Sequence, residues 1–131
     1  MQLVSVIIPT YNSAPFINRT ITSVINQVGF GETFNVQLII ADDNSTDNTV
    51  ELCERFKQIF KKGSYMDILT TTKNSGGPNN GRNIGLMAAQ GDVVCFLDHD
   101  DEWMPHKIHN QLKQIEYGAD FVYSPCIKEK G

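Results

Sequence analysis

The segment that most constrains this chain is an unbroken apolar run that leads straight into acidic residues. Val93–Leu97 contains five apolar residues in a row, and Asp98, Asp100 and Asp101 follow it. A run of this length with β-branched residues predicts a strand that is buried on both faces. Such strands form parallel sheets in α/β proteins, where ligands bind at the carboxyl ends of the strands. We therefore expect the three acids to lie at the ligand-binding edge of a sheet.

Strand and helix patterns alternate along the rest of the chain. β-Rich runs occupy residues 3–8, 36–41, 66–69, 93–97 and 121–123. Helical patterns separate them: an apolar stripe from Ile17 to Val28 that Asn12 or Ser13 can cap, a stripe from Leu52 to Phe60, a polar helix over residues 79–90, and a stripe from Ile108 to Ile115. This order predicts a single α/β domain over residues 1–131, with a mainly parallel sheet and helices on both faces.

Composition and charge argue against several classes of function. The chain has a net charge of −4 and no basic run, so its sequence does not favour a nucleic-acid partner held by phosphate contacts. Its longest apolar runs are strand-sized, which predicts no transmembrane segment, and its start has no signal-peptide pattern. Cys53, Cys95 and Cys126 stand far apart among apolar neighbours, which predicts reduced core thiols of a cytoplasmic protein.

The strand-to-helix turns of a parallel sheet share one edge, so their side chains can act together. Here those turns are residues 9–13, 42–47, 74–82 and 98–103. In the first two, Tyr11 offers an aromatic face to a base, and Asp43 offers an acceptor for an imide N–H or a ribose hydroxyl. We expect Asp42 to be structural instead, because neighbouring residues at a strand end point in opposite directions.

The later turns suggest contacts for a diphosphate and a metal ion. Glycines at positions 76, 77 and 81 would let the backbone approach a phosphate, and Arg82 is a cation placed to meet it. The three carboxylates after the 93–97 run would repel one another unless a cation lies among them. Mg²⁺ and Mn²⁺ prefer oxygen ligands, and Mg²⁺ is usually shared with substrate phosphates. Together the turns predict a pocket for a nucleoside diphosphate with Mn²⁺ or Mg²⁺.

Other patterns that could carry chemistry are absent or weak. No GxGxxG follows the first strand, and the chain contains no GxxxxGK[ST]. His106 and His109 could form half a metal site, but no Cys or third His stands near them, which favours an exposed or capping role. Trp103 could be a platform for an acceptor or a hydrophobic plug under the following helix, and the sequence leaves both open.

Five segments taken in order carry a family resemblance. They are residues 4–12 (VSVIIPTYN), 41–47 (ADDNSTD), 81–85 (GRNIG), 91–92 (GD) and 96–101 (FLDHDD). In order and spacing they resemble the successive motifs of family 2 glycosyltransferases, and the resemblance covers essentially the whole chain. It implies a Rossmann-like GT-A fold and an inverting transferase that uses a nucleotide-sugar, most often a UDP-sugar, with Mn²⁺ or Mg²⁺.

The resemblance also implies roles for individual residues on the nucleotide side. Thr10, Tyr11 and Asp43 would surround the base, and Pro9 and Gly77 would belong to the same nucleotide-sugar site.

On the diphosphate side, Asp98 and Asp100 would serve as the DxD motif of the family. Asp100 would contact the ribose, and Asp101 would face the metal ion and the diphosphate. Arg82 would lie near the diphosphate or the sugar. The metal ligands implied in this way are Asp100 and Asp101.

An inverting transferase also needs a general base, and the sequence offers no credible one. The acids after Asp101 are Glu102, Glu116, Asp120 and Glu129. Glu116 and Asp120 fall at the wrong edge of the predicted sheet, and Glu129 falls in the tail. We therefore expect a fold truncated at its C-terminus, the donor-binding part of a longer enzyme without its acceptor- and base-bearing part. The alternatives are a non-catalytic nucleotide- or sugar-binding module and, less favoured, a sugar nucleotidyltransferase, whose Gly-rich basic loop is missing after the first strand.

The resemblance further implies where such an enzyme works. It implies a saccharide or lipid-linked acceptor, in the synthesis of a polysaccharide or glycoconjugate. It implies a cytoplasmic protein, in some members peripheral at the inner face of the membrane. A sheet edge left exposed would also permit a homodimer.

Overall fold

We describe the chain from a computed structural model, which covers residues 1–73 and 78–116 in describable detail. The elements follow one another as β1 (Gln2–Thr10), α1 (Ile17–Ile25), β2 (Phe34–Asp42), α2 (Thr49–Glu54), the 3₁₀ helix η1 (Lys57–Ile59), β3 (Tyr65–Thr70), α3 (Pro78–Ala88), β4 (Val93–Phe96) and α4 (Lys107–Glu116). The expected alternation of strands and helices is confirmed as far as α4. The strand expected at residues 121–123 lies outside the described residues.

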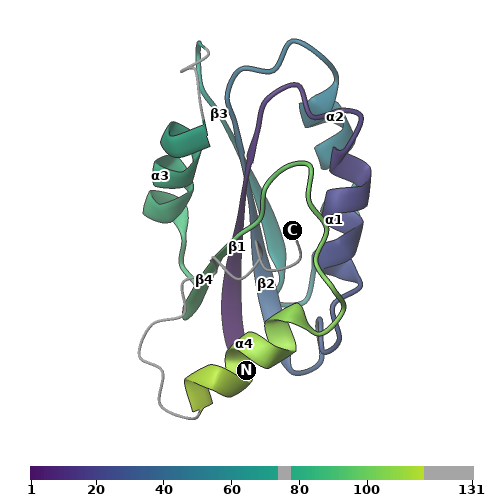
Figure 1. Cartoon of the computed structure of the whole chain (residues 1–131), viewed down its shortest axis with the longest axis vertical. Coiled ribbons are helices and arrows are strands. Elements are labelled where there is room, and N and C mark those ends of the chain that lie inside the picture. Colours follow the sequence, from purple (N-terminus) through teal and green to yellow (C-terminus); the bar gives the residue numbers. More distant parts are fainter. Residues whose placement is uncertain (74–77, 117–131) are drawn as a thin grey trace.

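The strands form one four-stranded parallel sheet in the order β3-β2-β1-β4 (Figure 1). β1 is an inner strand, and its Val4 pairs with Val36 of β2 on one side and with Val93 of β4 on the other. Every residue from Val4 to Thr10 is buried. A continuous buried run of this kind is typical of a parallel strand that is covered on both faces, so the mainly parallel sheet is confirmed.

Helices cover both faces of the sheet, as expected (Figure 1). α3 lies on one face, close to β1 and β2, while α1 and α2 lie on the other. α1 turns Ile17, Ile21 and Val24 inward, which is the predicted stripe of residues three and four apart. The core therefore consists of two apolar layers with the sheet between them.

α1 begins later than its sequence pattern suggests, and Ser13 supplies the reason. The residue before the helix is Phe16, which has no polar side chain to cap it, and the Ser13 hydroxyl lies 2.6 Å from His99 Nδ1. The Ser13 carbonyl instead accepts the N–H groups of Phe16 and Ile17, both at 2.9 Å, in a turn that precedes the helix. The helix also stops before Val28, whose exposed side chain leaves the predicted stripe.

The stripe predicted from Leu52 to Phe60 divides into two pieces. α2 ends at Glu54, and the 3₁₀ helix η1 follows it. Phe60 is buried, but Ile59 is exposed, so its expected inward position is wrong. A 3₁₀ helix has three residues per turn, and this tighter winding moves Ile59 off a stripe that assumes 3.6.

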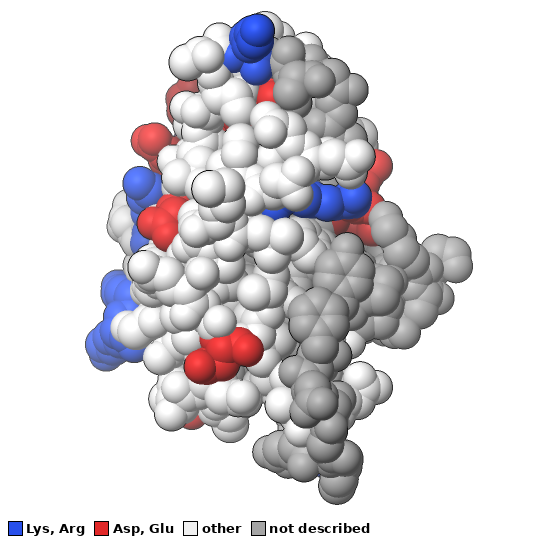
Figure 2. Space-filling view, turned by 90° about the vertical axis from the view of Figure 1, so that its left-hand side faces the viewer, with Lys and Arg blue, Asp and Glu red and all other residues white. Residues whose placement is uncertain are grey.

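Cys53 and Cys95 are free and buried, as predicted, while Cys126 lies outside the described residues. No helix in the described ranges is both long and apolar enough to cross a membrane. Figure 2 shows the α3 side of the molecule, on which charges of both signs are scattered among mainly uncharged side chains. Leu86 and Met87 of α3 are exposed apolar residues.

Candidate functional site

The turns after β1 and β2 lock together at the carboxyl edge of the sheet, the upper end of Figure 1. The N–H of Asn12 donates to Ser45 Oγ at 2.9 Å, and the N–H of Thr46 donates to Asn12 Oδ1 at 2.8 Å. Asn12 and Asn44 have positive φ angles of 47° and 60°, a conformation that Asn adopts more readily than most residues. These short polar side chains thus allow two tight turns to share one edge.

The neighbouring acids at the end of β2 have different partners. Asp42 is buried, and its Oδ1 accepts the hydroxyls of Thr10 and Ser45, both at 2.6 Å. Its Oδ2 accepts the Ser45 N–H at 2.9 Å, so the carboxylate closes the turn. Asp43 accepts the hydroxyl of Thr71 at 3.0 Å instead. The structural role predicted for Asp42 is confirmed.

Asp47 strengthens the same turn at the start of α2. Its carboxylate accepts the N–H and hydroxyl of Thr49 and the N–H of Ala14. Loss of some surrounding water favours the neutral acid, but the hydrogen bonds from Thr49 and Ala14 outweigh it and hold the pKa of Asp47 below its ordinary value. Asp47 therefore fastens the β2 turn to the β1 turn as a charged group.

Tyr11 presents its ring at this edge and is 44% exposed. Its neighbours Pro9 and Thr10 are buried, and the Thr10 hydroxyl is committed to Asp42. Asp43 is 7% exposed, and its N–H donates to the Thr10 carbonyl at 2.9 Å. Within the segment from Pro9 to Tyr11, Tyr11 is thus the residue whose side chain a ligand can reach, and direct contacts of Pro9 and Thr10 with a base stay predictions.

Arg82 of α3 and Asp98 after β4 form an ion pair, with 3.1 Å between the Arg82 Nη2 and the Asp98 Oδ1. Their side chains are 31% and 22% exposed, and ion pairs open to water contribute little to stability. The guanidinium has five N–H donors, so it can bind a ligand anion in addition to Asp98. The pair brings the predicted cation and the first predicted acid to the same edge.

The other two acids of the motif follow in a turn. The N–H of Asp101 donates to the Asp98 carbonyl at 3.0 Å. Asp100 is exposed and Asp101 is partly exposed. Among residues 1–73 and 78–116, no group of three or more His, Cys, Asp and Glu is placed to hold a metal ion. Arg82 is thus the cation beside Asp98. The assignment of Asp100 and Asp101 as metal ligands stays a prediction.

Sequence reasoning assigned no role in the site to His99, the residue between Asp98 and Asp100. His99 Nδ1 lies 2.6 Å from Ser13 Oγ, and the ring meets Phe16 edge to face with the ring centroids 6.1 Å apart. The Thr20 hydroxyl donates to the His99 carbonyl at 2.9 Å. The available signal was that His99 is the one non-acidic residue within Asp98–Asp101, at a position where side chains alternate in direction.

Of the three glycines in the glycine-rich turn, the structure describes one. Gly76 and Gly77 lie outside the described residues. Gly81 is buried, and a Cβ added to it would lie 3.0 Å from Pro9 Cβ and 3.4 Å from the Ala41 carbonyl. Gly81 thus turns its Cα toward the sheet and serves the close packing of α3. Its approach to a phosphate stays a prediction.

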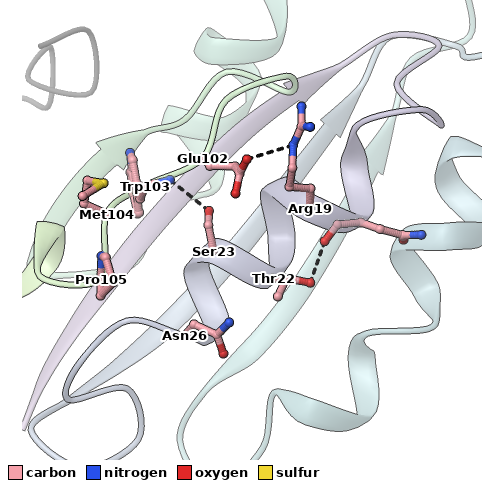
Figure 3. Close-up of a pocket in the computed structure, with 9 residues that line it drawn as sticks. Arg19, Thr22, Ser23, Asn26, Glu102, Trp103, Met104 and Pro105 are labelled. Atoms are coloured by element: carbon pink, nitrogen blue, oxygen red, sulfur yellow. Dashed lines mark hydrogen bonds and ion pairs between the residues drawn. The ribbon is translucent and has the colours of Figure 1, made fainter. Parts of the chain in front are cut away.

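A groove of about 570 Å³ lies on the α1 side of the sheet, between α1 and residues 102–105 (Figure 3). Arg19 and Glu102 line it and form an ion pair at 3.0 Å, and the backbone N–H of Trp103 donates to Ser23 Oγ at 3.1 Å. Trp103 is 5% exposed and belongs to the core, which confirms the hydrophobic-plug interpretation. The groove lining contains none of the predicted nucleotide contacts.

Comparison with known sequences identifies relatives of this chain. The family model described as "Glycosyl transferase family 2" matches residues 5–131. An uncharacterised glycosyltransferase of Haemophilus influenzae is 39% identical over 112 residues, which cover 86% of this chain and 42% of the relative. The UDP-Glc:α-D-GlcNAc-diphosphoundecaprenol β-1,3-glucosyltransferase WfaP of Escherichia coli is 36% identical over 135 aligned residues, which cover 99% of this chain and 48% of the relative.

Solved structures show the same likeness. TarS of Staphylococcus aureus, solved in complex with UDP, matches with a TM-score of 0.76 and 32% identity over 89% of this chain and 32% of that chain. This chain spans less than half the length of these relatives. Its four-stranded parallel sheet is the Rossmann-like sheet expected of the GT-A fold. Because the family model matches nearly every residue, this chain belongs to family 2 of the glycosyltransferases.

Proposed function

We propose that residues 1–131 form the donor-binding domain of an inverting glycosyltransferase that uses a UDP-sugar. The observation that carries this proposal is the carboxyl edge of the sheet, where Tyr11, Asp43, Arg82 and the Asp98–Asp101 turn come together. The likeness to TarS bound to UDP, and to WfaP, whose name includes UDP-Glc, supports uracil as the base.

The base binds on the β1 and β2 side of this edge. The exposed Tyr11 ring stacks on the base, an interaction worth roughly 1–3 kcal/mol for aromatic side chains. The nearly buried Asp43 carboxylate accepts the imide N–H of uracil. A buried acceptor of this kind discriminates against a base that has no donor at that position, because its own hydrogen bond is then lost.

The acids after β4 fit a metal ion that is shared with the ligand. Asp100 and Asp101 supply two carboxylates, and no further acid or His in the described ranges joins them in a metal-binding cluster. Mg²⁺ is usually held by one or two carboxylates together with substrate phosphates. We assign Asp100 and Asp101 to Mn²⁺ or Mg²⁺, with Asp100 also contacting the ribose. When bound, the ion supplies Lewis-acid stabilisation of the leaving diphosphate.

Arg82 and Asp98 orient the diphosphate. The ion pair with Asp98 holds the guanidinium at the edge of the sheet, where its remaining donors contact phosphate oxygens. As the bond between the sugar and the diphosphate breaks, negative charge grows on those oxygens. A cation that is already in position stabilises that charge without reorganising. Arg82 is therefore a binding and charge-stabilising residue in this proposal.

The acceptor and the general base belong to a part of the enzyme beyond residues 1–131. Inversion requires a base that takes the proton of the acceptor hydroxyl while its oxygen bonds to the anomeric carbon. Glu102, which follows Asp101, pairs with Arg19 of α1 and lines the groove on the α1 side. We propose a saccharide or a lipid-linked diphosphate as acceptor, the latter of the kind named for WfaP, with transfer at the cytoplasmic side of the membrane.

The proposal is tested by calorimetric titration of UDP, GDP and dTDP, each with and without Mn²⁺. We expect UDP to bind at least about tenfold more tightly with Mn²⁺, and Asp101→Asn to remove that gain. Asp92→Asn is the matched control, because Asp92 precedes β4 at the opposite edge of the sheet. Folded protein that binds none of the three nucleotides contradicts the proposal. Metal-independent binding favours a non-catalytic module, and a preference for GDP or dTDP reassigns the base.

A further inference from the structure

We propose that His99 is a positioning residue. Through its contact with Ser13, it holds the Asp98–Asp101 turn against the turn after β1, which carries Tyr11 (the Tyr11 turn). In this arrangement the base side and the diphosphate side of the site keep one fixed geometry. The inference rests on the nucleotide site proposed above, and it adds a residue that contacts neither the base nor the diphosphate.

The side chains of Asp98 and His99 leave the chain toward opposite faces of the sheet. Asp98 pairs with Arg82 of α3, which covers one face. The His99 ring contacts Ser13 and Phe16 at the start of α1, which covers the other face. The turn after β4 is therefore anchored on both sides, and Asp100 and Asp101 follow directly after these two anchors.

The α1-side anchor holds His99 at two points. Its ring nitrogen Nδ1 lies 2.6 Å from Ser13 Oγ, and its carbonyl accepts the Thr20 hydroxyl at 2.9 Å. The ring also meets the edge of Phe16. Both the ring and the backbone carbonyl of His99 are therefore held by α1 and the turn before it. The position of α1 thus determines where the turn with the acids lies.

Ser13 extends this connection to the turns after β1 and β2. It is fully buried, its N–H donates to Thr49 Oγ1 at 2.8 Å, and its Oγ accepts the N–H of Tyr11 at 3.1 Å. A hydroxyl has two lone pairs and one proton, so Ser13 Oγ can accept from Tyr11 and also share a hydrogen bond with His99 Nδ1. Loss of His99 leaves a buried hydroxyl without this partner, which favours rearrangement of both turns.

Fixed geometry matters because one ligand spans both turns. A nucleoside diphosphate contacts Tyr11 with its base and the Asp98–Asp101 turn with its diphosphate. When the two turns move independently, part of the binding free energy is lost in ordering them. The contact between His99 and Ser13 removes this loss before the ligand arrives.

The first test measures the fastening by amide hydrogen exchange in His99→Leu, which keeps apolar volume against Phe16 but has no hydrogen bond for Ser13. We expect exchange at the amides of Tyr11 and Asp101 to rise by about tenfold or more. His99→Asn carries a polar atom near the position of Nδ1 and should stay within about threefold of wild type. His106→Leu, an exposed His before α4, is the matched control and should change neither amide. Unchanged exchange in His99→Leu overturns the proposal.

The second test measures UDP affinity with Mn²⁺ in the same variants. We expect about a tenfold loss in His99→Leu, recovery to within about threefold in His99→Asn, and a smaller loss for uracil, which has no ribose or diphosphate to contact the Asp98–Asp101 turn. Ser13→Ala removes the same contact from the other side and should reproduce this pattern, which covers the case in which His99→Leu does not fold. A folded His99→Leu with wild-type affinity overturns the positioning role. Wild-type protein that binds no nucleotide overturns the proposed function instead, and the exchange experiment then decides on the fastening alone.

Discussion

Asp42 and Asp43 are identical side chains on adjacent residues, yet their surroundings give them different roles. The Asp42 carboxylate is buried and accepts three hydrogen bonds from Thr10 and Ser45. Burial of a carboxylate is unfavourable unless such bonds are made, so this turn depends on them. Asp43 is 7% exposed, and its carboxylate accepts the hydroxyl of Thr71 from the strand end beside β2.

This difference predicts that replacing Asp by Asn lowers stability at position 42 and weakens UDP binding at position 43. Asp42→Asn should lower the free energy of unfolding by about 2–3 kcal/mol, because the amide NH₂ cannot accept the bonds of the oxygen it replaces. Asp43→Asn should change stability by less than about 1 kcal/mol, because its amide oxygen still accepts from Thr71, and it should weaken UDP binding. Urea denaturation measures the stabilities, and calorimetry measures the affinities. Equal destabilisation by the two variants would contradict these roles.

Among the elements, α3 packs on the sheet through two glycines, which leave no room for a side chain. A Cβ added to Gly85 would overlap Cγ2 of Ile7 in β1, and Gly81 one helical turn earlier faces Pro9. Cγ2 of Ile7 is attached to the β-branched carbon and cannot swing aside cheaply. Glycine at these positions has a lower helix propensity than Ala, but it allows the close packing of α3 that places Arg82 at the nucleotide edge.

Gly85→Ala tests this close packing. Overpacking costs roughly 1–3 kcal/mol, and the gain in helix propensity returns about 1 kcal/mol, so we expect a net destabilisation of about 1–2 kcal/mol. Asn83→Ala, on the exposed side of α3, is the matched control and should be neutral or slightly stabilising. In an Ile7→Ala background the added methyl group has room, so the cost should fall. An equal cost of Gly85→Ala in both backgrounds, measured by urea denaturation, would be inconsistent with a clash at Ile7.

How far the sequence predicts these elements depends on the range of the interactions involved. The strands and the inward face of α1 follow from local periodicity, and the structure confirms them. The contact of the expected cap residue Ser13 does not, because its partner His99 is 86 residues away. The same holds for the site. The sequence predicts which acids reach the carboxyl edge, whereas the pairing of Asp98 with Arg82 depends on the packing of α3.

At the scale of the whole molecule, two buried thiols on different elements can report whether the domain unfolds as one unit. Cys53 lies in α2 and Cys95 in β4, and both are buried. Burial, together with the negative charges of Asp42 and Glu54, raises the pKa of Cys53 from 9.0 to about 12. Because the thiolate is the reactive form, this shift alone makes native Cys53 react about a thousandfold more slowly at pH 8 than an exposed thiol.

We expect both thiols to become reactive at the same urea concentration, together with the loss of circular dichroism. The reason is that α2 and β4 lie at different places on one sheet, so a two-state domain exposes them together. Alkylation with iodoacetamide, followed by peptide mass spectrometry, measures each cysteine separately. If Cys53 reacted at lower urea than Cys95, α2 would open as a separate unit of lower stability. Such an opening would release Thr49, which bonds Ser13, and would loosen the edge of the sheet before the core unfolds.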